Sequence, residues 1–392
     1  MKNTTASNTE TGKVMFDYPI ILDGATGTEL IKHGYSGKGS SEEWTLEHPE
    51  AIIRIQQGYI DAGSQIIYSP TFGANRAKMT PLGKQDKVDE YNHRLVELSK
   101  TAAKGRALVA GDMSPTGLFI GNSVKYNELY EIYLEQASAL KSAGVDLFVI
   151  ETMVSIDDAS AALKAVKKVS DLPVIVSVTV DEGGRMLCGA DAAAALIKMQ
   201  GMGADIFGLN CSAGPSEMLT QIKRISGFSR VPLLAKPNAG MPKMTENGPV
   251  YDIDPAEFAS YAPMMAEYGV KVFGGCCGTD ARHIRALCET VSGITGFADN
   301  CSGGILGATP REAVRFDSIP EDFPVDLHED VRSQIRTAKT EGVQLLGFEL
   351  NTESDLDLFL KTVRRLDIPV RLSGNAELVS RASEEYPGYS FE

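Results

Sequence analysis

The stretch Val-Lys-Val-Phe-Gly-Gly-Cys-Cys-Gly-Thr, residues Val270 to Thr279, decides how the chain is interpreted. Its first four residues predict a strand, which a glycine-rich turn and then a helical pattern follow at once. Because glycine lacks a Cβ atom, the backbone around the three glycines can take positive φ and pack closely. We therefore expect Cys276 and Cys277 to point into one common space at the end of a strand.

A third cysteine strengthens this interpretation. Adjacent thiols rarely form a disulfide with each other, and two buried, inert cysteines are the alternative for the pair alone. However, Cys211 also ends a strand-like run, from Ala204 to Ser212. Three thiolates that converge from two strand ends suit a tetrahedral Zn²⁺ with an open fourth position, as in catalytic zinc sites. The sequence therefore predicts a zinc site made by Cys211, Cys276 and Cys277.

Composition limits the classes of function. The 392 residues are 43% hydrophobic and 23% charged, so the chain can bury a large core in one or two domains. A net charge of -14 gives no basic surface for nucleic acid or an anionic membrane, and no apolar run is long enough to span a bilayer. Six cysteines are too few for a disulfide framework, and residues 1–13 lack a signal-peptide pattern. We expect a cytoplasmic protein.

Apolar runs alternate with helical patterns eight times between residues 15 and 295. The runs are continuously apolar, which is typical of strands buried on both faces of a parallel sheet. Eight such units predict a (β/α)₈ TIM barrel. A doubly wound open sheet is the alternative, but no Gly-x-Gly-x-x-Gly turn follows the first strand. The expected strands are residues 19–23, 64–69, 107–111, 145–150, 173–180, 205–210, 231–235 and 270–273.

Polar residues follow most of these strands. The active site of such a barrel lies at the carboxyl ends of its strands, so a ring of polar groups around the cysteines predicts an active site. Unpaired buried carboxylates are costly, so Asp23 and Glu151 indicate a cationic ligand, although solvated strand ends are the alternative. The polar residues at strand ends are Asp23, Thr71, Asp112, Glu151, Asn210, Cys211, Asn238, Cys276 and Cys277.

Eight short motifs run through the expected barrel in order. With them the chain resembles the homocysteine S-methyltransferase family, and within it most closely the homocysteine-binding barrel of cobalamin-dependent methionine synthase. The motifs are Asp-Gly-Ala-Thr-Gly-Thr-Glu at 23–29, His-Pro-Glu at 48–50, Thr-Phe-Gly-Ala-Asn at 71–75, Gly-Asp-Met-Ser-Pro-Thr-Gly at 111–117, Glu-Thr-Met at 151–153, Leu-Asn-Cys-Ser at 209–212, Pro-Asn-Ala-Gly at 237–240 and Gly-Gly-Cys-Cys-Gly-Thr at 274–279.

The resemblance implies roles for individual residues. The three cysteines would hold zinc, with Asn238 as a fourth, displaceable ligand. Asp23 and Glu151 would bind the amino group of homocysteine, and backbone N–H groups of the turn at residues 24–28 its carboxylate. The expected substrate-binding residues are Asp23, Gly24, Ala25, Thr26, Glu151 and Asn210.

The expected reaction is methyl transfer to the sulfur of homocysteine, which gives methionine. A thiol with a pKa of about 8.5 is mostly protonated at neutral pH, and binding to Zn²⁺ removes that proton and places the sulfur. Cobalamin-dependent methionine synthases continue into further domains, so we expect the donor, a methyl-corrinoid such as methylcobalamin, on a separate partner protein. S-methylmethionine and betaine are the alternative donors, and Trp44 could contact the quaternary ammonium of betaine.

The last part of the chain carries no motif that we recognise. We expect a flexible leader over residues 1–14, the barrel over residues 15–297, and a linker with a small α/β appendage over residues 298–392. Residues 302–324 are expected to be a connection. The appendage could be a docking or oligomer surface, and a zinc-bearing binding module without turnover is the alternative class of function. We expect Cys188 and Cys288 to be structural.

Overall fold

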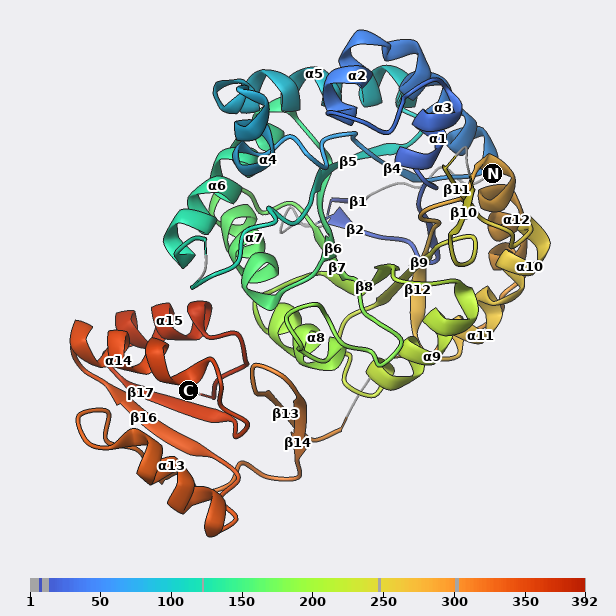
Figure 1. Cartoon of the computed structure of the whole chain (residues 1–392). Coiled ribbons are helices and arrows are strands. Elements are labelled where there is room, and N and C mark those ends of the chain that lie inside the picture. The colour runs from blue at the N-terminus through green and yellow to red at the C-terminus, as the bar shows by residue number, and fades with distance from the viewer. Residues whose placement is uncertain (1–6, 9–13, 122, 246–247, 300–302, 392) are drawn as a thin grey trace.

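The computed structural model describes residues 7–8, 14–121, 123–245, 248–299 and 303–391. Eight parallel strands form one sheet in the order β3-β12-β9-β8-β7-β6-β5-β4, and helices surround it (Figure 1). All eight expected strands are present, so the predicted (β/α)₈ barrel is confirmed. The strands are β3 (Ile20–Ile21), β4 (Ile66–Tyr68), β5 (Leu108–Met113), β6 (Leu147–Met153), β7 (Val174–Val178), β8 (Ile206–Cys211), β9 (Leu233–Pro237) and β12 (Val270–Phe273).

Hydrogen bonds close the barrel between its first and second strands. The backbone N–H of Gln65, directly before β4, donates to the carbonyl oxygen of Ile21 in β3 at 2.8 Å. The side chain of Gln65 accepts from the N–H of Ile21, also at 2.8 Å. The hydroxyl of Ser64 donates to the carbonyl oxygen of Leu22 at 3.0 Å. Side chains therefore do part of the pairing that two short strands cannot complete alone.

Apolar side chains fill the barrel on both sides of its strands. Alternate strand residues such as Leu22, Val149 and Val272 form a buried cluster inside the barrel. The intervening residues pack against the surrounding helices in a larger cluster. The helices are α1 (Gly27–Lys32), α2 (Ser41–Glu47), α3 (Pro49–Ala62), α4 (Arg76–Met79), α5 (Val88–Ala103), α6 (Tyr126–Ala143), α7 (Ile156–Val169), α8 (Ala192–Gly201), α9 (Pro215–Ser226), α10 (Pro255–Ser260), α11 (Ala262–Ala266) and α12 (Ala281–Ser292).

The loop after β9 contains two short strands. It carries an antiparallel pair, β10 (Lys243–Thr245) and β11 (Gly248–Val250), over the carboxyl ends of the strands. The predicted leader, residues 1–14, lies mostly outside the described residues. Within it and just after it, β1 (Ser7–Asn8) pairs with β2 (Val14–Met15). Among the described residues, no helix combines the length and apolarity that crossing a membrane requires.

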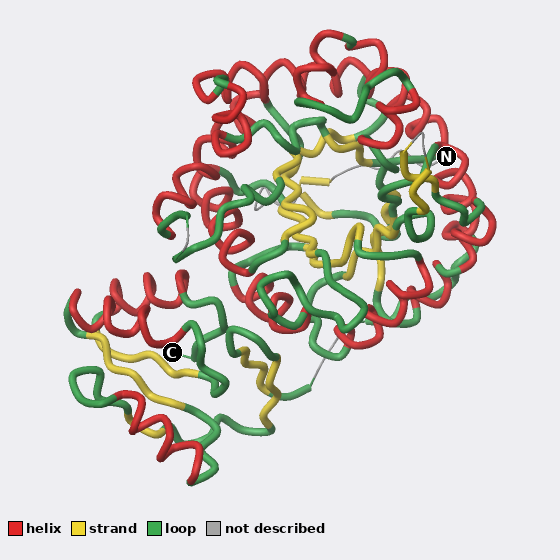
Figure 2. Tube along the Cα trace, viewed as in Figure 1, coloured by secondary structure: helices red, strands yellow, loops and turns green. Residues whose placement is uncertain are grey.

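Residues 303–391, which we name the C-terminal unit, have their own hydrophobic core. A three-stranded parallel sheet is covered by helices, and Figure 2 shows it beside the barrel. The expected connection at 302–324 is instead partly strand, since β13 and β14 form a hairpin that the short runs did not indicate. The elements are β13 (Ile305–Ala308), β14 (Ala313–Phe316), β15 (Phe323–Pro324), α13 (Val331–Thr340), β16 (Leu346–Leu350), α14 (Glu353–Val363), β17 (Val370–Gly374) and α15 (Ala376–Glu385).

The C-terminal unit packs on barrel helices α7 and α8 through polar contacts. Arg364 places one nitrogen 2.9 Å from a carboxylate oxygen of Asp157 on α7. The N–H of Asp191, at the start of α8, donates to the carbonyl oxygen of Arg311 at 2.7 Å. The unit therefore covers the outer wall of the barrel and leaves the carboxyl ends of the strands uncovered (Figure 1).

Candidate metal and substrate site

The three thiols that the sequence singles out lie together. The Sγ atoms of Cys211, Cys276 and Cys277 are all within 4.8 Å of one another. Cys211 ends β8 and the other two follow β12, so distant parts of the sequence meet here. Among the described residues this is the one group of three or more Cys, His, Asp or Glu side chains with such spacing. Three converging sulfur atoms are the donors that Zn²⁺ prefers, so the residues fit that ion.

The cysteine turn needs its glycines mainly because neighbouring atoms leave no room for a Cβ atom, and less because of positive φ angles. Of the three, only Gly278 has a positive φ, 82°. At Gly275 a Cβ atom would lie 2.4 Å from the hydroxyl oxygen of Thr279. That hydroxyl donates to the carbonyl oxygen of Cys276 at 2.7 Å and accepts from the N–H of Ala25 at 3.1 Å. The turn and the loop after β3 are therefore held together by one threonine.

Two further side chains lie at the cluster. The phenol of Tyr251 lies beside the thiol of Cys277, and its ring covers Gly278. Asn238 follows β9, and its buried side-chain oxygen has no hydrogen-bond partner among the described residues. An unpaired buried oxygen is costly, so this acceptor is available to an ion. Sequence reasoning missed Tyr251, which lies in the long loop where no pattern marks it.

A buried lysine, Lys236, lies near the thiols. Its Nζ atom is 3.1 Å from a carboxylate oxygen of Asp23 and 3.8 Å from one of Glu151. It also lies 3.8 Å from the centre of the Tyr68 ring, while the N–H of Tyr68 donates to Asp23 at 2.7 Å. Burial lowers the pKa of Lys236, but the two carboxylates outweigh burial and raise that pKa well above its usual value. This residue is therefore a cation.

Sequence reasoning missed Lys236 as well, although a signal was present. It directly follows the apolar run of residues 231–235, at the carboxyl end of an expected strand. That position is the one that selected Asp23 and Glu151. A lysine there could have been predicted to neutralise a ring of carboxylates.

Asn210 orients Glu151. The Asn210 oxygen accepts from the N–H of Thr152 at 2.8 Å and from the hydroxyl of Ser177 at 2.9 Å. Its nitrogen donates to the hydroxyl of Thr152 at 2.7 Å and to Glu151 at 3.3 Å. Thr152 has a positive φ of 59°, which is unusual for a β-branched residue, and the Asn210 side chain supports that backbone.

Negative charge at the site exceeds what Lys236 can balance. Burial raises the pKa of Glu151 to about 7. Asp112 lies nearby with one carboxyl oxygen lacking a hydrogen-bond partner among the described residues, and burial followed by the Glu151 charge raises its pKa well above the usual value. Protons therefore stay on these acids until another cation arrives.

These groups surround a cavity of about 270 Å³. Seven of the ten predicted site residues line it, namely Gly24, Ala25, Thr26, Glu151, Cys211, Cys276 and Cys277. The other three, Asp23, Asn210 and Asn238, are buried beside it and are not part of its wall. Asp112 and Lys236 also line the cavity.

Trp44 and the remaining described cysteines lie outside the cavity wall. The ring of Trp44 stacks on His48 with 4.4 Å between the ring centres. Cys288 packs beside Gly63, where a Cβ atom would lie 2.5 Å from its sulfur. Cys188 is exposed. Cys301 is outside the described residues.

Comparison with known proteins identifies the family of the chain. The model of the family described as homocysteine S-methyltransferase matches residues 20–291. The chain therefore belongs to the homocysteine S-methyltransferase family, as the motifs predict.

Two curated relatives and one solved structure serve as points of comparison. Methionine synthase of Mycobacterium leprae is 31% identical over 292 residues, which are 70% of this chain and 24% of that protein. Methionine synthase of Mycobacterium tuberculosis is 29% identical, over 70% of this chain and 25% of that protein. The chain thus spans about a quarter of the length of these relatives. The metallated homocysteine methyltransferase MmuM of Escherichia coli shares the fold, with a TM-score of 0.59, 22% identity, and coverage of 69% of this chain and 95% of that one.

Proposed function

We propose that this chain transfers a methyl group to the sulfur of homocysteine and so forms methionine. The observation that carries the proposal is the cavity itself, because its wall combines three thiols within 4.8 Å of one another with buried acids. A sulfur-rich metal site beside acids whose charge Lys236 alone does not balance suits a small molecule with both a thiol and an ammonium group. Homocysteine has both groups.

The acids would bind the ammonium group of the substrate. Glu151 lines the cavity, whereas Asp23 lies outside its wall. Asp23 adds its negative charge to the site and forms an ion pair with Lys236. Asp112 lines the same cavity and offers its unpartnered oxygen. An incoming ammonium group would replace the protons that burial otherwise keeps on these acids. The loop at residues 24–27 lines the same cavity and offers backbone N–H groups to the substrate carboxylate.

The cysteines would hold the metal. Cys211, Cys276 and Cys277 supply three sulfur ligands, and the free oxygen of Asn238 supplies a fourth that the substrate can displace. When bound, zinc lowers the pKa of the substrate thiol and fixes its sulfur. The sulfur lone pair forms the new carbon–sulfur bond, the bond from the methyl group to its donor breaks with its electrons left on the donor, and the thiol proton passes to solvent.

A methyl-corrinoid such as methylcobalamin, held by a separate protein, is the proposed donor. The similarity to methionine synthases over 70% of this chain supports it. Betaine is less favoured because Trp44 stacks on His48, outside the cavity wall. S-methylmethionine is the second candidate donor. Free thiols at the site favour a reducing, cytoplasmic environment.

A methyl-transfer assay on zinc-loaded protein tests the proposal. Homocysteine is offered with methylcobalamin, S-methylmethionine or betaine, and methionine is measured. Formation from methylcobalamin alone supports the corrinoid route, and formation only from a sulfonium or betaine moves the chain to the cobalamin-independent branch. Bound zinc without methionine from any donor, and without proton release on addition of homocysteine, favours the binding module.

Replacement of one metal ligand should abolish the reaction. We expect Cys276→Ala to lose bound zinc and to lower methyl transfer by more than the roughly 10- to 100-fold that loss of an outer-shell partner costs. Zinc content and the initial rate measure this. Cys288→Ala, outside the site, is the matched control and should keep both. Full methyl transfer by the Cys276→Ala protein would refute the mechanism.

A further inference from the structure

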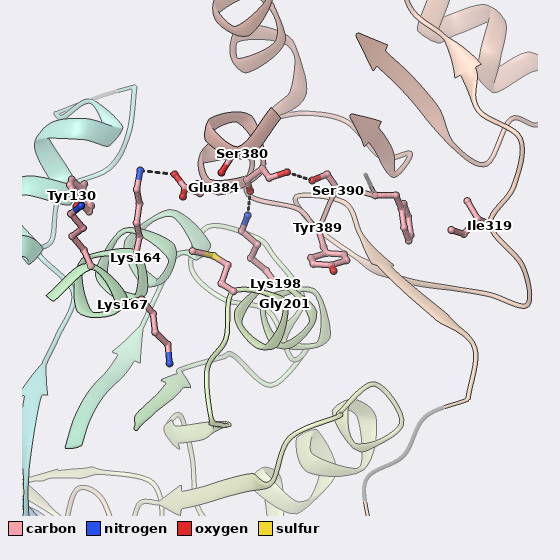
Figure 3. A pocket seen from close by; sticks show the side chains of 14 residues that line it. Tyr130, Lys164, Lys167, Lys198, Gly201, Ile319, Ser380, Glu384, Tyr389 and Ser390 are labelled. Carbon is pink, nitrogen blue, oxygen red and sulfur yellow. Dashed lines mark hydrogen bonds and ion pairs between the residues drawn. The ribbon is translucent and has the colours of Figure 1, made fainter. Parts of the chain in front are cut away.

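A second cavity lies between the barrel and the C-terminal unit. Its volume is about 820 Å³, within the range of roughly 300–1,000 Å³ typical of small-molecule sites. Helices α6, α7 and α8 form one side, and α15 with the last residues of the chain forms the other (Figure 3). None of the residues that line the thiol cavity lines this one. It is a separate candidate site.

Lysines dominate the ionisable groups of its wall. Lys164, Lys167 and Lys168 come from α7, and Lys198 comes from α8. Among the described residues that line it, Glu384 is the one carboxylate. The whole chain has a net charge of -14, so this local excess of cations runs against the overall composition. Such a wall attracts anions.

Two of the lysines already have anionic partners. The Nζ atom of Lys164 lies 2.7 Å from a carboxylate oxygen of Glu384. The Nζ atom of Lys167 lies 3.3 Å from a carboxylate oxygen of Asp205. Lys168 is exposed and forms no ion pair with a described residue. The carboxylates near the cavity are therefore used by Lys164 and Lys167, and Lys168 and Lys198 are left without one.

Lys198 is the informative residue, because it is only 2% exposed. Its Nζ atom donates to the backbone oxygen of Ser383, and Figure 3 shows the side chain reaching from α8 toward α15. In the described part of the chain Lys198 forms no ion pair, and the two nearby acids have other partners, since Asp157 pairs with Arg364 and Glu384 with Lys164. Burial lowers the pKa of Lys198 to about 7, against the opposing charges of Asp157 and Glu384.

A buried lysine with one carbonyl partner is costly, and a methionine would fill the same space more favourably. An ammonium group has three N–H donors, and the bond to Ser383 uses one. Aromatic rings lie in the same wall, from Tyr130 on α6 and from Tyr389 and Phe391 near the chain end. Flat apolar surface beside unpaired cations suits a ligand with both an aromatic part and an anionic part.

We propose that this cavity binds a phosphorylated small molecule of nucleotide size, with its phosphate oxygens on Lys198 and Lys168. Phosphate oxygens are strong acceptors for lysine N–H donors, and such bonds are stronger than bonds between neutral groups. The ligand contacts the barrel and the C-terminal unit at once, so it stabilises their association. The proposal is independent of the methyl-transfer activity.

Binding of ADP to the full-length, zinc-loaded protein tests the proposal, with adenosine and pyrophosphate as comparison probes. Isothermal titration should detect ADP, adenosine should bind at least about tenfold more weakly, and ADP should raise the thermal unfolding temperature. Pyrophosphate that binds as ADP does would also support phosphate recognition. Adenosine that binds as tightly as ADP, or no binding of ADP or pyrophosphate at millimolar concentration, would overturn the proposal.

Variants of the two lysines test whether the ligand binds in this cavity. Lys198→Met removes the charge, keeps most of the length of the side chain, and should weaken ADP binding roughly 10- to 100-fold, as expected for lost bonds to a charged group. Lys168→Gln changes an exposed side chain, cannot disturb the core, and should weaken binding severalfold. Lys141→Met, an exposed lysine on α6 that is not in the cavity wall, is the control for lost charge. ADP affinity unchanged in both cavity variants would contradict the assignment.

Discussion

Two buried lysines, one in each cavity, are accommodated in opposite ways. Lys236 is 4% exposed and has Asp23, Glu151 and the Tyr68 ring around it. Lys198 is 2% exposed and has one backbone oxygen. The carboxylates raise the pKa of the first, whereas burial lowers the pKa of the second to about 7. Burial alone therefore does not determine the charge of a lysine, because the partners on neighbouring elements decide it.

The fold explains the difference. Parallel strands of a closed barrel bring their carboxyl ends to one rim, so charged residues from β9, β6 and the loop after β3 meet. At the outer wall, acids that could have met Lys198 are engaged by Arg364 and Lys164. Lys236 belongs to a network that supplies it with carboxylates, and Lys198 belongs to a network that lacks an anion.

The largest expected effect follows from removal of the paired lysine. Lys236→Met leaves Asp23 and Glu151 buried without their cation, which typically costs about 3–5 kcal/mol of unfolding free energy. The loss should be larger at pH 8 than at pH 5, because at low pH the acids can take up protons instead. Urea unfolding followed by the fluorescence of Trp44, the single tryptophan, measures it.

A double variant separates lost charge from lost packing. Asp23→Asn combined with Lys236→Met should recover part of the stability, since one unpaired charge is removed with its partner. If Lys236→Met were as stable as the parent at pH 8, Lys236 and the carboxylates would not form the network described here.

Removal of the unpaired lysine, Lys198, should raise the free energy of unfolding instead of lowering it. A lysine with a pKa of about 7 when folded and about 10.4 when unfolded destabilises the folded state most below pH 7, and this cost falls as the pH rises toward 10. Lys198→Met should therefore be more stable than the parent at pH 7, and the gain should shrink by about 2 kcal/mol between pH 7 and pH 9. Unfolding at pH 7, 8 and 9 measures it.

Lys141→Met is the matched control for that series. Its side chain is exposed, so its effect on stability should not vary over the same range. A constant difference between Lys198→Met and the parent from pH 7 to 9 would mean that Lys198 keeps its proton in the folded protein and that the contrast with Lys236 is wrong.

The site around Lys236 and its carboxylates could be predicted from the sequence better than the cavity around Lys198. Continuous apolar runs gave the eight strands, and polar residues at strand ends gave the three thiols, Asp23 and Glu151, because a parallel barrel converts position at a strand end into proximity. Lys236 follows the same rule and was missed. Tyr251 could not be found this way, because it directly follows β11 in the loop after β9 and does not end a barrel strand.

The cavity of Lys198 could not be predicted from the sequence. Its wall joins helices of the barrel to residues 380–391, and no periodicity relates these segments. A single lysine near the end of an alanine-rich helix usually lies in solvent. Lys198 is buried here because α15 packs over it, and that contact depends on tertiary structure alone.

The smallest expected effect concerns Glu151, the partner of Lys236 that is not fully ionised near neutral pH. Glu151 has a pKa of about 7, so Lys236 has not removed its tendency to hold a proton. If Glu151 binds the ammonium group of the substrate, it must be ionised to do so, and affinity should rise as the pH rises toward 7.5. Methionine, the proposed product, has no thiol to titrate, and its affinity should increase about eightfold between pH 6 and pH 7.5, as ionisation of one acid with that pKa requires. Isothermal titration measures this, and Glu151→Gln should bind weakly at every pH. A steep pH dependence that survives in Glu151→Gln would assign the proton to Asp112, the neighbouring acid whose free oxygen faces the same ligand.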